Sequence, residues 1–169
     1  AALVDGALEA ARVSPADPDW PGVTDPIAVP DVDHWDEETA AAAADARAER
    51  VAAFVAAARG LETAGSVSTQ AIRLAFANTA GQAVTGRTTV ASIDAIARTA
   101  TSDGVARRAS ASLAAIDGGE AGGLAARKAR DAADPTDIEP GRYEVVLEPS
   151  CVANMLTFLQ NHGYGGRGV

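Results

Sequence analysis

Cysteine is almost absent from this sequence of 169 residues, which contains Cys151 alone. A single thiol excludes a disulfide within the chain and any zinc module built from several cysteines. Structural disulfides belong to oxidising compartments, so a chain without them fits a reducing one. We therefore expect a cytoplasmic protein.

Large apolar side chains are also scarce. Aromatic residues make up 4% of the sequence, and many of the positions behind its hydrophobic content of 47% are alanine. Alanine buries little area, so the core should be thin and rich in helix unless another element covers it. No apolar run approaches the roughly 20 residues of a membrane-spanning helix, and the first residues carry acids instead of the basic start of a signal peptide. We expect neither a membrane anchor nor a signal peptide.

Acidic residues outnumber basic residues, and the whole excess lies in the first 50 residues. The formal net charge is −9; residues 1–50 hold twelve acidic and three basic side chains, whereas the remaining residues hold eleven of each. A chain without a basic stripe lacks the electrostatic footprint that a phosphate backbone requires. Direct binding of nucleic acid is therefore not expected.

Residues 1–62 predict two helices joined by an arm. The stretch "ALVDGALEAARVS" has apolar residues at helical spacing, which indicates a short amphipathic helix. The following span holds five of the eight prolines; because proline lacks an N–H and fixes φ, it predicts an extended arm, anchored by Trp20 and Trp35. A long alanine-rich helix should follow, with Asp36 as its cap and Gly60 as its end.

Residues 63–137 change from a helical period to a strand period. Ile72, Leu74 and Phe76 alternate with small or polar residues, "NTAG" supplies a turn, and a threonine-rich run returns. A second turn at "TSDG" leads into a third strand. The glycine-containing run "GGEAGGLAARKARDAADP" predicts a helix across the open face of this meander, weakened by Gly122 and Gly123. Three antiparallel strands covered by a helix make an α+β fold.

Residues 138–169 predict one more strand and helix. "RYEVVLEPS" is rich in β-branched residues, and "CVANMLTFLQNHG" has apolar residues at helical spacing. We expect this pair to open a β-rich domain that the chain does not complete, so that the chain is a fragment of a larger protein.

The residues offer few candidates for chemistry. One imidazole on a helix cannot hold zinc, so His162 is interpreted as a helix-end histidine and His34 as a surface residue. Cys151 follows an apolar run and is interpreted as a packed, inert thiol. The acidic cluster "DVDHWDEE" lacks the glycine of an EF-hand loop and is interpreted as cap charge. "GYGGRG" lacks the Lys-Ser/Thr pair of a P-loop.

Three stretches carry a resemblance to a known family. The arm "SPADPDWPG", the meander "IRLAFANTAGQAVTGRTTVASIDAIA" and above all "DIEPGRYEVVLEPSCVANMLTFL" resemble the TldD/PmbA family, also called TldD/TldE or modulator of DNA gyrase proteins. The resemblance covers essentially the whole chain. It implies an N-terminal α/β domain, a central region and a large β-rich C-terminal domain, of which this chain would hold only a part.

The resemblance also implies where a metal site would lie. The family's catalytic member carries His-Glu-x-x-x-His and a later Asp on the helix after the Val-Val-Leu strand. Laid on this sequence, that motif falls on Thr157, Phe158, His162 and Arg167, so only one position matches. Without the other ligands and the Glu there is no zinc and no group to activate water. We expect no catalytic residue and no metal in this chain.

The leading interpretation is a TldE/PmbA-like subunit, inactive alone. Its partner would be a TldD-like subunit or a second copy of itself, its substrate a peptide, and zinc would belong to the catalytic partner. Two alternatives stay open. In the first alternative, the protein is a metallopeptidase in its own right, with ligands beyond residue 169. In the second, it is a non-enzymatic interaction module whose acidic arm binds a basic partner.

Overall fold

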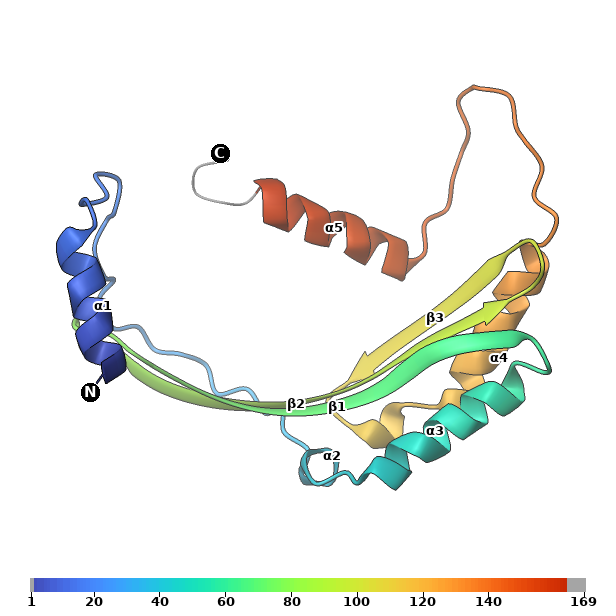
Figure 1. Cartoon of the computed structure of the whole chain (residues 1–169). Coiled ribbons are helices and arrows are strands. Elements are labelled where there is room, and N and C mark those ends of the chain that lie inside the picture. Colours follow the sequence, from blue (N-terminus) through green and yellow to red (C-terminus); the bar gives the residue numbers. More distant parts are fainter. Residues whose placement is uncertain (1, 164–169) are drawn as a thin grey trace. The chain divides into compact units, whose positions relative to one another are not determined.

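The computed structural model describes residues 2–163 (Figure 1). The helices are α1 (Ala2–Val13), α2 (Glu37–Ala40), α3 (Ala44–Ala57), α4 (Gly118–Asp131) and α5 (Pro149–Gly163); a 3₁₀ turn, η1, spans Leu113–Ala115; the strands are β1 (Glu62–Ala77), β2 (Ala83–Arg98) and β3 (Asp103–Ser110). The chain divides into two compact units. One joins the residues up to Val32 with Leu74–Gly86, and the other joins Asp33–Arg73 with the residues from Arg87 onward.

The three strands form one antiparallel sheet in the order β1-β2-β3, which confirms the predicted meander and the α+β class. In the second unit, Arg98 lies opposite Asp103 at one end of the β2–β3 pair and Ala91 lies opposite Ser110 at the other. Every second residue of β2 from Ala91 to Ala97 is buried, and Ile93 is among the largest fully buried side chains. The helices α3 and α4 lie on this face (Figure 1). The core consists of Phe54, Ala58, Ala91, Ile93, Ala95, Ala97, Ala106, Leu113, Ile116, Ala121, Ala125, Ala126 and Ala129.

The alternating apolar residues of β1, such as Leu74 and Phe76, lie on the face of the sheet opposite the buried residues of β2. The hydroxyl oxygens of Ser68 and Ser92 lie 2.9 Å apart. Since side chains alternate along a strand, the even-numbered residues of β1 lie on the face opposite Ile93. Leu74 and Phe76 are 65% and 58% exposed. The helix α4 covers a face of the sheet, as predicted, and the residues of β2 on that face are mostly alanines.

Close approach to α3 explains two of the four glycines of α4. A Cβ on Gly122 would collide with the backbone of Phe54 in α3, and one on Gly118 would collide with the backbone of Arg50. A Cβ on Gly104 in β3 would likewise collide with the backbone of α4. Gly118 and Gly122 weaken α4 as an isolated helix but let α3 pack directly against its backbone, and Gly104 lets β3 pack directly against it.

The long helix expected from the alanine-rich run is two helices, α2 and α3. Between them the carbonyl of Ala42 accepts a hydrogen bond from Arg47 Nη1 at 3.0 Å, and the same nitrogen donates to Thr69 Oγ1 at 3.0 Å. These bonds hold the backbone at the break between the two helices, although alanine favours a helix. Asp36 caps α2 and Gly60, at φ 79°, follows the end of α3, as predicted.

The first unit contains α1, the proline-rich arm and the tip of the β1–β2 hairpin. The arm contains no helix, as predicted, and two hydrogen bonds hold it to the hairpin. Ile27 N–H donates to Gln82 Oε1 at 2.7 Å, and Asn78 Nδ2 donates to the Thr24 carbonyl at 3.3 Å. Trp20 is 67% exposed, so the prediction that it anchors the arm is wrong.

Residues 142–148 do not form the predicted strand. Val146 is 96% exposed, and no strand within residues 2–163 pairs with this segment. A strand exists only where a neighbour accepts its backbone hydrogen bonds, which β-branched composition cannot supply by itself. The helix predicted after it is present as α5. The division into 1–62, 63–137 and 138–169 remains a prediction.

No helix among the described residues is long and apolar enough to cross a membrane.

Candidate functional site: the C-terminal helix and the edge of the sheet

The helix α5 begins at a proline, directly after a carbonyl that accepts two of its first N–H groups. Pro149 occupies its first position, where a missing N–H costs nothing. The carbonyl of Glu148 accepts the N–H groups of Cys151 at 2.9 Å and Val152 at 3.2 Å. None of the residues of α5 is buried. Its exposed large apolar side chains are Val152, Met155, Leu156, Phe158 and Leu159.

The positions of the family's metal motif lie on this helix with other partners. Thr157 Oγ1 donates to the carbonyl of Ala153 at 2.9 Å, within the helix. The rings of Phe158 and His162 pack with centroids 4.5 Å apart and a tilt of 40°. These contacts suit a helix surface and supply no metal ligand besides one imidazole. Arg167, the fourth position, lies outside the described residues, as does most of "GYGGRG".

Among residues 2–163, no cluster of three or more His, Cys, Asp or Glu side chains could hold a metal ion. Cys151 is free and exposed, so the prediction of a packed thiol is wrong; the apolar run before it is itself exposed. His34 is exposed, as predicted, and its carbonyl accepts Thr89 N–H at 2.8 Å.

The acidic cluster before α2 acts as a cap. Asp36 Oδ1 accepts the N–H of Thr39 at 2.6 Å. This backbone bond, together with the Ser112 hydroxyl, lowers the pKa of Asp36 below its ordinary value. Thr39 is buried, and its hydroxyl oxygen accepts the N–H of Leu113 at 2.7 Å. Thr39 therefore links the capped helix α2 to η1 through this hydrogen bond.

The outer edge of β3 borders a groove. The groove has a volume of about 770 Å³ and is lined by residues 92–94 of β2, residues 106–109 of β3, Leu124 and Lys128 of α4, Glu148, and the first turns of α5. Lys128 Nζ donates to the carbonyl of Val105 at 3.0 Å and also to Glu148. A lysine side chain therefore takes the place of a neighbouring strand at this point of the edge.

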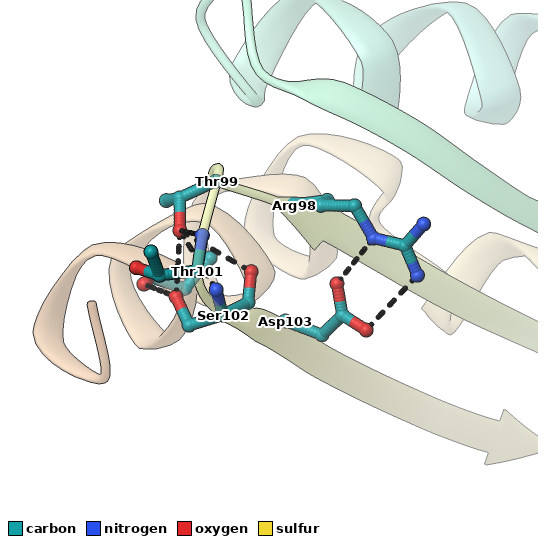
Figure 2. A network of polar contacts seen from close by, with 6 residues as sticks. Arg98, Thr99, Thr101, Ser102 and Asp103 are labelled. Atoms are coloured by element: carbon teal, nitrogen blue, oxygen red, sulfur yellow. Dashed lines mark hydrogen bonds and ion pairs between the residues drawn. The ribbon is translucent and has the colours of Figure 1, made fainter. Parts of the chain in front are cut away.

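A polar network closes one end of this edge (Figure 2). Arg98 Nε donates to Asp103 Oδ1 at 2.6 Å and its Nη2 donates to Oδ2 at 3.1 Å. This two-point bond lowers the pKa of Asp103 and raises that of Arg98. Thr99 Oγ1 accepts the N–H of Ser102 at 3.1 Å, and Ser102 Oγ donates to the carbonyl of Ala129. The turn between β2 and β3 is thereby fixed to the end of α4.

Trp35 anchors the end of the arm, as predicted. The guanidinium carbons of Arg73 and Arg87 lie 5.2 and 5.0 Å from its ring centroid. Such cation–π contacts hold an indole against a strand pair, here β1 and β2. Arg87 also pairs with Glu37 at 3.4 Å.

Two solved structures resemble this chain. One is TldE from Thermococcus kodakarensis, with a TM-score of 0.61 and 19% identity, matched over 75% of this chain and 31% of that one. The matched part of the chain shares the fold of about a third of TldE. The other is a protein from Thermotoga maritima named as a modulator of a DNA gyrase, with a TM-score of 0.58 and 16% identity, matched over 70% of this chain and 30% of that one. No protein-family model and no curated protein sequence matches the chain.

The TldE-like fold confirms, at the level of structure, the resemblance inferred from the sequence. The chain spans about 30% of the length of each solved relative. The sequence analysis did not identify the Arg98–Asp103 pair or the groove beside β3. The one available signal was "DGVARR", where Asp103, Val105 and Arg107 fall on one face of a strand.

Proposed function

We propose that this chain is part of a TldE-like subunit that is inactive alone and works with a zinc-bearing TldD-like subunit in a peptidase that cleaves unfolded or modified peptides. The observation that carries the proposal is the occupancy of the motif positions on α5. Thr157 bonds within the helix and Phe158 packs on His162, so the side chains at these positions serve the helix surface.

The chemistry of these residues supports the non-catalytic role. A catalytic zinc needs three protein ligands and a group that activates the bound water. A threonine hydroxyl bonded to a helix carbonyl and a phenyl ring offer neither. The structural similarity to TldE supports the fold that the proposal assumes and is consistent with this role.

Reconstitution tests the proposal. The full-length protein that contains this chain is purified alone and mixed with a TldD-like subunit, and cleavage of an unfolded polypeptide is measured with and without a zinc chelator. We expect no cleavage by the protein alone and zinc-dependent cleavage by the mixture. His162→Ala is the matched variant: it should leave the activity of the mixture unchanged, because His162 is not a ligand in this account. Cleavage by the protein alone that is lost in His162→Ala would contradict the proposal.

A further inference from the structure

We propose that Arg73, held over the ring of Trp35, binds a carboxylate carried on a short apolar chain, in a cavity between α2 and β1. The inference rests on this cavity alone and is independent of the proposed role in peptide cleavage.

The cavity is a built feature of the second compact unit, the one that begins at Asp33. Its volume is about 440 Å³, which lies within the range of small-molecule sites. One side belongs to β1, another to α2 and its C-terminal end, and a third to the indole of Trp35. The lining residues are Trp35, Glu37, Ala40, Ala41, Ala71 and Arg73.

The Arg73 side chain is positioned but lacks an acceptor. Its guanidinium carbon lies 5.2 Å from the ring centroid of Trp35. A guanidinium over an aromatic ring is held in place by that contact and still has its N–H donors for another partner. Among residues 2–163, no carboxylate or other acceptor bonds to the Arg73 side chain. Arg73 is therefore preorganised for an anion that arrives from outside.

The local charge favours an anion as well. Arg73 lies five residues after Ser68 and Arg87 five residues before Ser92, and the two serine hydroxyls are in contact, so the arginines face each other across β1 and β2. Like charges at facing positions destabilise a strand pair. Glu37 pairs with Arg87 at 3.4 Å, which leaves the charge of Arg73 without a counterion in the described chain. A bound anion would supply it.

The other walls select the kind of anion. The planar guanidinium fork matches the two oxygens of a carboxylate. Glu37 lines the same cavity, so its negative charge disfavours a ligand with two negative charges, such as hydrogen phosphate. Three alanines offer apolar surface and leave room for a few CH₂ groups. The ligand class is therefore a monocarboxylate with a short carbon chain, whether a free acid or the side chain of a glutamate.

Tryptophan fluorescence tests the site with two carboxylate probes. Trp20→Phe leaves Trp35 as the only tryptophan of the chain. At constant ionic strength, we expect saturable changes with butyrate and with N-acetylglutamate amide, and none with butyramide, which lacks the charge. The tighter acid identifies the natural source as a free acid or a side chain. No saturable change with either acid, or an equal change with butyramide, would overturn the proposal.

Charge variants in the same background identify the binding group. Arg73→Gln should weaken butyrate binding about tenfold or more, because a charge-assisted pair is lost. Arg127→Gln is the matched control: it removes the same charge from an exposed position of α4 and should leave the affinity unchanged. With folding checked by circular dichroism, butyrate affinity that is equal in the two variants would contradict a role for Arg73.

A cavity-filling variant leaves charge unchanged. Ala71→Leu places three more carbon atoms in the cavity and should weaken butyrate binding by a similar factor. Ala75→Leu is its control, since Ala75 is also exposed on β1 but does not line this cavity. Inorganic phosphate should bind more weakly than butyrate to the natural site. Equal binding by both leucine variants would exclude this cavity, and tighter binding of phosphate would exclude a carboxylate as its ligand.

Discussion

Replacement of Gly122 by alanine separates helix propensity from packing. Within an isolated helix this change is stabilising by about 1 kcal/mol, because glycine loses more backbone entropy on folding. In this fold the added Cβ would lie 3.0 Å from the carbonyl carbon and the Cα of Phe54, and closer still to the carbonyl oxygen. Backbone atoms of a packed helix cannot swing aside as a side chain does, so α3 and α4 must separate. Overpacking of this kind costs about 1–3 kcal/mol.

Gly123 is the matched control in the same helix turn. A Cβ there meets nothing within 4 Å. We therefore expect Gly123→Ala to stabilise the protein by about 0.5–1 kcal/mol and Gly122→Ala to destabilise it by about 1–3 kcal/mol. Urea unfolding followed by circular dichroism at the helix band measures both. If Gly122→Ala is as stable as Gly123→Ala, the close approach of α3 and α4 is wrong.

Substitutions at three other positions probe the core and the cap. Thr39→Val removes the acceptor of the buried Leu113 N–H and should cost about 1–3 kcal/mol in urea unfolding, whereas Thr39→Ser keeps the hydroxyl and should cost less. Phe54→Ala empties a buried site and should cost about 3–5 kcal/mol in the same assay; a loss below about 1 kcal/mol would contradict its place in the core. The lowered pKa of Asp36 means that its contribution to stability is complete above the ordinary value of 3.8 and is lost as the pH falls through the lower folded value. Asp36→Asn keeps the cap oxygen but should remove this acid dependence from thermal unfolding, and an unchanged pH profile would exclude the carboxylate as its source.

The sequence predicted the elements better than their packing. The strand period around Ile72 and the turns on either side of β2 indicated the meander, because these signals are local. The face that α4 covers could not be predicted, since alanines of β2 supply it and Leu74 and Phe76 do not. From the sequence, Gly122 was interpreted only as a residue that weakens α4. Its close approach to α3 depends on how the two helices pack, which the sequence of α4 does not contain.

In the candidate site, too, the local elements could be predicted and their packing could not. Thr157 and Phe158 could be placed from the motif because α5 has a clear helical period. The exposure of Cys151 could not be predicted, because the strand expected before it found no partner in the described chain.

The zinc content of the full-length protein tests the central claim most directly. The protein is purified alone without chelators, dialysed against metal-free buffer and analysed by mass spectrometry of the metal. The account predicts far less than one zinc per chain, because Thr157 and Phe158 stand where two of the motif's residues would be. One tightly bound zinc per chain, together with peptide cleavage by the protein alone, would contradict it.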